Sequence, residues 1–269
     1  MTKFAALSVQ PPHPPYVGPI GDRLKVKGPA DITLRPNVPL VDAIQKRAAV
    51  DIAGYSRMIS NLDMNIGRIV QALIELGIDR ETYIVFFSDH GDMLGSHGLW
   101  NKSVPFEESI RIPFILAMAG GRYHINVGES DAVLNHVDIA PTTLGLCGIE
   151  QPEYMVGFDY SSTITVNAGL QVESAPCTEP ESAYLQQIVR KMHPGTVYER
   201  WRGVVTRDGW KYVVMPGHPW LLFNLNVDPY EQANLAFDLA HSAQRKRCHT
   251  ALEEWMSITE DAFPLPEII

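Results

Sequence analysis

The sequence predicts an α/β layered domain followed by a smaller α+β unit that contains an antiparallel sheet. First, a long helical pattern over residues 41–76 precedes a short apolar run at 83–88. Second, short strand-like runs within 201–225 are separated by Asp-Gly and Pro-Gly pairs. Helices that alternate with apolar strands indicate packed α/β layers, and two-residue turns indicate antiparallel hairpins. We therefore expect an α/β unit over residues 1–150 and an α+β unit over 151–269.

The composition fits a globular protein and excludes two classes of partner. The chain has 269 residues, a net charge of -9 and 45% hydrophobic residues, which suits one large domain or a large and a small one. No Lys/Arg-rich run offers a surface for nucleic acid, and no run approaches a membrane segment of about 20 apolar residues. No signal peptide is visible, so we expect a soluble protein, with the cytoplasm as the default for an unknown compartment.

The N-terminal region combines a short strand, a rigid loop and a long helix. Residues 4–9 read as a short buried strand. In the following stretch, His13 stands among four prolines, which exclude a helix and favour an extended loop. Between residues 41 and 76 the apolar side chains recur every three or four positions, which predicts a helix that ends near Gly77.

Three strands are expected after the helix. Residues 83–88 form a continuous run of aromatic and β-branched side chains, typical of a strand buried on both faces of a parallel sheet. Residues 112–117 and 132–137 predict two more strands. Asp138 is expected to cap a helix that runs to Leu146.

The C-terminal part carries strand and helix patterns only after residue 200. Residues 151–200 show no sustained periodicity and predict no element. Strands are expected at 203–206, 210–214 and 221–225, joined by tight turns, and a helix at 241–258.

The residues with the clearest chemistry lie at 88–102, directly after the predicted strand. Ligands of open α/β sheets bind at the carboxyl ends of the strands. Asp89 and His90 offer adjacent oxygen and nitrogen donors that suit a divalent cation, and Lys102 offers a positive charge for an anionic group. Taken alone, an Asp-His pair in a glycine-rich loop more often reflects turn chemistry than a metal site.

The 88–102 segment resembles the second metal-binding motif of the sulfatases, S-D-H-G-[DE]-x-L-G-x-H-G-x-x-x-K. Sulfatases belong to the alkaline-phosphatase superfamily, so the resemblance implies an alkaline-phosphatase-like layered sheet, truncated here at its N-terminal side. It also implies a sulfuric ester hydrolase. Further stretches resemble the family's motifs in the same order, namely residues 4–16, 106–113, 137–142, 201–206, 211–212 and 228–235.

The resemblance assigns roles to single residues. It implies that Asp89 and His90 are metal ligands and that His13 and Lys102 are catalytic residues that contact the sulfate group, with His13 able to donate a proton. His97 either lines the rim of the substrate pocket or holds the loop by a backbone hydrogen bond. The family usually uses Ca²⁺, but a histidine ligand leaves Mn²⁺ open. Structural roles in ion pairs, caps and turns are expected for Glu107, Glu108, Arg111, Asp138, Asp228 and Asn234.

One part of the family pattern is missing from these 269 residues. Sulfatases carry C-x-P-S-R or S-x-P-x-R, matured to formylglycine, and an earlier Asp-Asp pair; neither motif is present. The flanks of Cys147, Cys177 and Cys248 do not match the maturation site, and the three read as reduced structural thiols. We therefore expect a fragment that is inactive alone, and either a missing N-terminal half or self-association as its partner.

Three functions remain open from the sequence. The first is hydrolysis of a small-molecule or carbohydrate sulfate ester. The second is hydrolysis of a phosphonate monoester or phosphodiester, because the same loop pattern occurs in those enzymes. The third is a non-catalytic remnant that binds metal.

Overall fold

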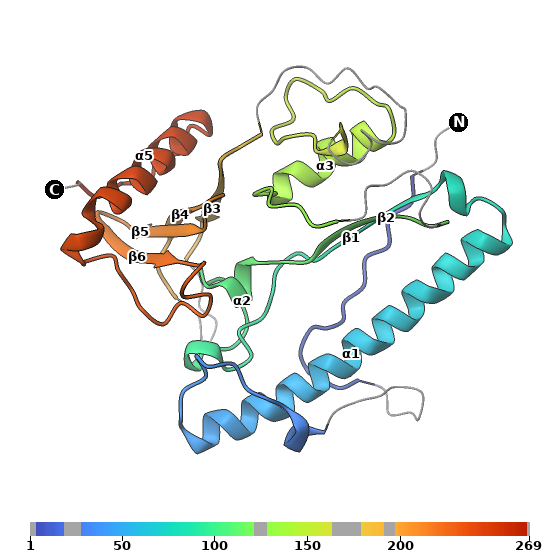
Figure 1. The fold of residues 1–269 in the computed structure, drawn as a ribbon, viewed down its shortest axis with the longest axis horizontal. Coiled ribbons are helices and arrows are strands. Elements are labelled where there is room, and N and C mark those ends of the chain that lie inside the picture. The colour runs from blue at the N-terminus through green and yellow to red at the C-terminus, as the bar shows by residue number, and fades with distance from the viewer. Residues whose placement is uncertain (1–3, 19–27, 121–127, 163–178, 191–196, 268–269) are drawn as a thin grey trace.

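The computed structural model describes residues 4–18, 28–120, 128–162, 179–190 and 197–267. Figure 1 shows two parts that lie side by side, a two-stranded ribbon with flanking helices and a four-stranded sheet with one helix across it. The two sheets share no strand. The architecture is therefore α/β, as predicted, while the boundary at residue 150 stays a prediction.

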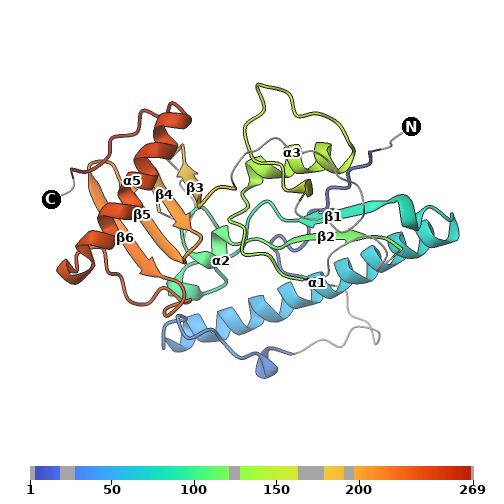
Figure 2. The ribbon, with the colours of Figure 1, turned by 45° about the horizontal axis from the view of Figure 1, so that its top comes forward.

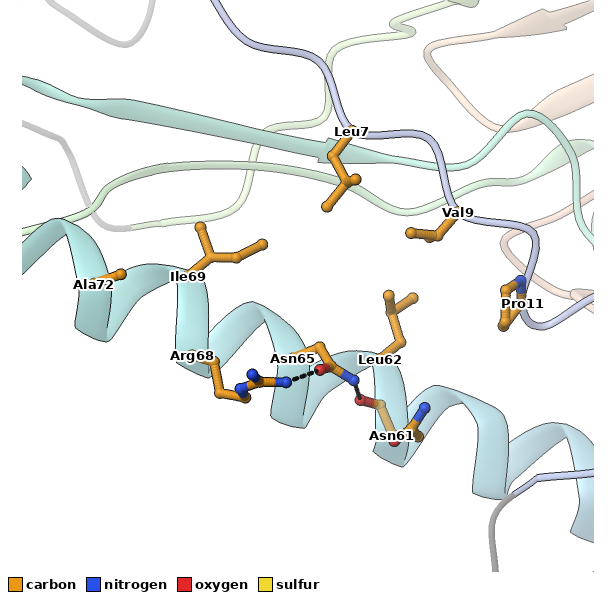
Figure 3. A pocket seen from close by; sticks show the side chains of 9 residues that line it. All are labelled: Leu7, Val9, Pro11, Asn61, Leu62, Asn65, Arg68, Ile69 and Ala72. Carbon is orange, nitrogen blue, oxygen red and sulfur yellow. Dashed lines mark hydrogen bonds between the residues drawn. The ribbon is translucent and has the colours of Figure 1, made fainter.

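Helix α1 (Asp42–Glu75) confirms the predicted long helix. Its buried positions lie in the first half, at Ala48, Ala53, Gly54 and Met58. The second half carries exposed apolar side chains and forms one wall of an open groove, with the N-terminal segment as the other wall (Figure 3). The residues that line the groove are Leu7, Val9, Pro11, Asn61, Leu62, Asn65, Arg68, Ile69 and Ala72.

Strand β1 (Tyr83–Phe87) pairs with β2 (Phe114–Met118) in antiparallel register, with Tyr83 opposite Met118. Figures 1 and 2 place this ribbon between α1 and helix α3 (His136–Leu146). Both expected strands are present, but the predicted parallel pairing is wrong. The prediction of burial on both faces is also wrong, because β1 is half-buried and Phe87 is exposed. Apolar content reflects a tendency to be buried and says nothing about strand direction.

Two other predicted strands are absent from the described residues. Residues 4–9 are extended but exposed, and no neighbouring strand bonds to them. Residues 132–137 end in the start of α3, where the Asn135 side chain accepts a hydrogen bond from His136 N at 2.7 Å. Asp138 is therefore not the N-cap; it lies three residues inside and accepts a bond from Asn135 N at 2.6 Å. Asn135 is the residue directly before the first turn of α3, so its side chain caps the helix. Asp138, at the third helical position, bonds back to Asn135 N and completes a capping box.

The C-terminal sheet contains four antiparallel strands in chain order, β3 (Ser182–Gln187), β4 (Trp201–Thr206), β5 (Trp210–Met215) and β6 (His218–Asn224). The three predicted strands and their tight turns are confirmed. Helix α5 (Ser242–Ile258) confirms the predicted last helix. Strand β3 lies in the stretch for which no element was predicted.

The two faces of this sheet pack against different parts of the chain. Because side chains alternate along a strand, Tyr212 and Val214 face α5 and share a core with Leu252. Val213 points to the opposite face and belongs to a cluster that contacts Phe106 and Ile110 around the short helix α2 (Glu107–Ile110). This second face therefore joins the C-terminal sheet to the segment that follows the 88–102 loop.

Short 3-10 helices connect these elements at η1 (Pro29–Asp31), η2 (Asp79–Glu81), η3 (Ser96–Gly98) and η4 (Leu239–His241). No helix of the described residues combines the length and apolar character that crossing a membrane requires.

Candidate active site

The loop that follows β1 is folded tightly against α2. Gly91 N donates a hydrogen bond to Ser109 O at 2.8 Å, and a Cβ atom on Gly91 would overlap the carbonyl oxygen of Glu108. Gly95 has a φ of 95°, in the left-handed region that glycine tolerates best. Glycine is thus required at two points where the loop makes a close approach or a sharp turn.

Asp89 and His90 project from this loop and face each other. Asp89 Oδ2 lies 3.5 Å from His90 Nε2, and the two side chains are 83% and 34% exposed. His90 Nδ1 lies 2.8 Å from Gly91 O, so Nδ1 carries a proton, and in the neutral ring the lone pair is on Nε2. In that form, Nε2 and Asp89 Oδ2 are two acceptors 3.5 Å apart. One shared cation satisfies such a pair, since ligand atoms at 2.0–2.6 Å from an ion lie close together.

The carboxylate of Asp89 is held in its charged form. Partial burial acts to raise its pKa, but the nearby His90 and the hydrogen bonds from His90 N and Ser88 Oγ prevail and lower the pKa below its ordinary value. His136, which the sequence analysis did not single out, lies beside this turn, with Nε2 3.1 Å from Ser88 O. Its position at the start of α3 gave no signal of contact with a loop 48 residues earlier.

His13 lies on a loop that is tied to the 88–102 loop through another residue. The Tyr16 hydroxyl donates a hydrogen bond to Asp92 Oδ2 at 2.6 Å, and burial followed by this bond raises the Tyr16 pKa. His13 itself is exposed, and its Nδ1 lies 2.8 Å from Pro14 O. The Tyr16–Asp92 bond therefore brings the proline-rich loop to the loop that carries Asp89 and His90.

Lys102 is half-buried, and within the described part of the chain its ammonium group makes no hydrogen bond or ion pair. The structure shows no direct contact of His13 or Lys102 with Asp89 or His90. Convergence of all four side chains on one pocket stays a prediction. None of them lines the groove along α1.

His97 is half-buried and contacts residues other than Asp89 and His90. Its ring stacks on Phe106 with centroids 4.1 Å apart, and its backbone N donates to Asn37 O at 2.8 Å. Its φ of 53° is in the left-handed region. Burial lowers the pKa of His97 and favours the neutral ring. This position supports the loop-holding alternative of the two expected roles.

A buried ionic network lies between α2 and the C-terminal sheet. Lys211 is fully buried, and its Nζ lies 2.6 Å from both Glu107 Oε1 and Glu231 Oε1 and 2.9 Å from Pro105 O. Glu231 Oε2 accepts a bond from Glu107 N at 2.7 Å. Burial raises the pKa of Glu231 to about 7, although Lys211 acts in the opposite direction.

The sequence analysis expected an ion-pair role for Glu107, which this network confirms, but it did not single out Lys211 or Glu231. The available signal was a lysine inside an apolar strand, between Trp210 and Tyr212. The other expected structural residues also hold turns: Asp228 accepts bonds from Gln232 N and Ala233 N, and Asn234 Oδ1 accepts from Leu222 N.

A second group with metal-ligating side chains lies next to this network. Ligand atoms of His97, Glu108 and Glu231 all lie within 4.8 Å of one another. This group does not include Asp89 or His90. His97 lies in η3, Glu108 in α2 and Glu231 in the turn after β6.

Comparison with known proteins assigns the chain to a family. The sequence profile described as Sulfatase matches residues 3–149, more than half of the chain, and the profile described as N-sulphoglucosamine sulphohydrolase, C-terminal, matches residues 95–257. The ulvan-active sulfatase of Formosa agariphila is 29% identical over 234 residues, which cover 86% of this chain and 43% of the relative. The chain thus spans less than half of that relative's length.

Solved structures show the same fold. The yidJ sulfatase structure from Bacteroides fragilis matches with a TM-score of 0.74 and 26% identity, covering 94% of this chain and 53% of the other. The phosphonate monoester hydrolase of Agrobacterium radiobacter matches with a TM-score of 0.64 and 24% identity, covering 79% and 42%. The alkaline-phosphatase-like fold is thereby confirmed. With the family profile over its first 149 residues and this fold, the chain belongs to the sulfatase family.

Proposed function

We propose that the complete protein hydrolyses a sulfate monoester, carried by a small molecule or a carbohydrate, with the help of a divalent cation. The observation that carries the proposal is the pair of facing acceptors, Asp89 Oδ2 and His90 Nε2, 3.5 Å apart at the exposed end of β1. Membership of the sulfatase family supports the reaction class.

The residues of this chain have distinct roles in the proposal. Asp89 and His90 hold the cation, with Ca²⁺ expected and Mn²⁺ as the alternative. When bound, the cation neutralises the negative charge of the sulfate oxygens. Lys102 binds another sulfate oxygen, and His13 donates a proton to the leaving oxygen. The Tyr16–Asp92 hydrogen bond positions the loop of His13.

The nucleophile is proposed to be a formylglycine supplied by residues outside these 269, in an N-terminal half of the catalytic domain. The chain spans 43% of a curated relative's length, and it contains neither maturation motif. Removal of a covalent nucleophile costs a factor on the order of 10⁶ in turnover, so we expect no sulfatase activity from this chain alone.

Turnover of p-nitrophenyl sulfate by the complete protein tests the assignment. The variants Asp89→Asn and Lys102→Ala are each expected to lose at least about a hundredfold in kcat/KM. Asp63→Asn is the matched control, because Asp63 is an exposed carboxylate on α1 that forms no hydrogen bond or ion pair with the described residues. Wild-type turnover in Asp89→Asn would exclude this residue as a ligand.

A second candidate function is hydrolysis of a phosphonate monoester or phosphodiester. The fold shared with the phosphonate monoester hydrolase supports it. The kcat/KM values of the complete protein for p-nitrophenyl sulfate and p-nitrophenyl phenylphosphonate, measured side by side, distinguish the two. Turnover of neither ester, with retained metal binding, would favour the non-catalytic remnant.

A further inference from the structure

The group around His97 contains more hydrogen-bond acceptors than donors. Asn37 is only 6% exposed, and its Nδ2 lies 3.2 Å from His97 Nε2, 2.7 Å from Glu108 Oε1 and 3.1 Å from Tyr230 O. Glu108 Oε1 and Tyr230 O use both hydrogens of the amide nitrogen, and His97 Nε2 is a third acceptor in the tautomer that carries its proton on Nδ1. The Oδ1 atom of the same amide is buried and has no partner.

Glu108 adds a second orphaned acceptor, because its Oε2 is also buried without a partner. The two side chains with an orphaned acceptor are hydrogen-bonded to each other, from Asn37 Nδ2 to Glu108 Oε1. A buried acceptor without a donor costs about 1–3 kcal/mol, so two of them in one place indicate that something binds there.

Lys211 does not supply the missing positive charge. Its three hydrogens are used by Glu107 Oε1, Glu231 Oε1 and Pro105 O. Glu107 and Glu231 pair with Lys211, and a third carboxylate, Glu108, lies close to His97 and Glu231. When all three carboxylates are ionised, these groups carry a formal charge of about -2, which is costly for side chains that are partly or fully buried.

We propose that His97, Glu108 and Glu231 bind one divalent cation. The ligand atoms of the three titratable residues lie within 4.8 Å of one another, and two ligands on opposite sides of an ion at about 2.0–2.6 Å lie at most about 5.2 Å apart. One imidazole nitrogen among oxygen ligands favours a borderline ion, Zn²⁺ or Mn²⁺, over Ca²⁺.

The role of this ion is structural. It joins the 88–111 segment and the turn after β6, which are brought together only in the folded chain. It neutralises the carboxylate excess and gives the buried Glu108 Oε2 a partner. The site uses neither Asp89 nor His90, so it is independent of the proposed catalytic function.

Calorimetric titration of the 269-residue chain with ZnCl₂ and MnCl₂ tests the proposal. The variant Asp89→Asn/His90→Gln removes the other candidate ligands, and in it we expect one saturable ion per chain. Glu108→Gln and His97→Asn, introduced into that background, are expected to weaken binding at least tenfold. Asparagine tolerates the left-handed backbone at position 97. Unchanged binding in both variants, or no saturable binding in the background, would overturn the site.

A measurement without these substitutions guards against variants that do not fold. Crystals of the wild-type chain soaked in ZnCl₂ or MnCl₂ are expected to show an anomalous difference peak among His97, Glu108 and Glu231. A water-like feature at that position without anomalous signal, or peaks only elsewhere, would contradict the proposal.

Discussion

The two ends of the segment that joins β1 to β2 hold charged side chains in opposite environments. Asp89 and His90 at its start point outward, and the Asp89 side chain is 83% exposed. Glu107 near its end pairs with Lys211, which is fully buried. Exposed charges keep most of their hydration, whereas buried charges depend on their partners. The first group is therefore free to bind a ligand, and the second holds two parts of the chain together.

The largest effect on stability is expected for Lys211→Met. The substitution leaves Glu107 and Glu231 without their ammonium partner and should lower the free energy of unfolding by about 3–5 kcal/mol. Urea denaturation measures the change. Lys46→Met is the matched control, because Lys46 forms an exposed pair with Asp42 and should change stability by less than about 0.5 kcal/mol. Equal effects of the two substitutions would refute the contrast.

The pH dependence of stability sharpens the same contrast. The Glu231 pKa of about 7 in the folded chain lies above its ordinary value of 4.5. The stabilisation that its proton provides is therefore complete below pH 4.5 and is lost as the pH rises through 7. We expect wild type to lose up to roughly 3 kcal/mol over this range relative to Glu231→Gln. Parallel urea series for the two proteins at pH 5, 6, 7 and 8 check it; a constant difference would exclude titration of Glu231.

Gly91→Ala tests the close approach that connects the two ends of the segment. The new methyl group would overlap Glu108 O, so the loop must shift, at a cost on the order of 2 kcal/mol. Gly67→Ala provides a control of the opposite sign. Gly67 lies within α1 with no atom close to its Cβ position, so alanine should stabilise by about 0.5–1 kcal/mol. Thermal unfolding of both variants measures the difference, and a neutral Gly91→Ala would show that the loop has room.

The smallest effect on stability is expected for Asp89→Asn. Because this carboxylate is mostly exposed, the free energy of unfolding should change by less than about 0.5 kcal/mol. Urea denaturation beside Lys211→Met gives the comparison directly. A loss above about 2 kcal/mol would place Asp89 among the structural charges.

Local patterns predicted the fold best where neighbours in sequence decide the outcome. The spacing of apolar residues gave α1 and α5, and the turn residues gave the hairpins of β4, β5 and β6. Strand direction, the extra strand β3 and the absence of a strand at 4–9 depend on pairing with distant segments, which a local pattern does not contain.

The candidate site follows the same rule. The motif at 88–102 identified Asp89 and His90, and the structure places their donor atoms close together. The motif gave no sign that His97 lies beside Asn37 and Glu231, because the contacts in this region join distant residues, such as Asn37 and Tyr230, which are 193 positions apart. The local traces of the buried network were Glu107, for which an ion pair was expected, and the lysine inside the apolar strand β5.

The buried link from Lys211 to the 105–107 segment also has a consequence for the order of folding. Lys211 Nζ reaches Pro105 O across 106 residues, and Glu107 N reaches Glu231 across 124. The hairpins of the C-terminal sheet close short loops, while this link closes a long one and bears a larger entropic cost. We therefore expect the hairpins to form first and the link late. In pulsed hydrogen exchange during refolding, the amide of Glu107 should gain protection after the amides of β4 and β5.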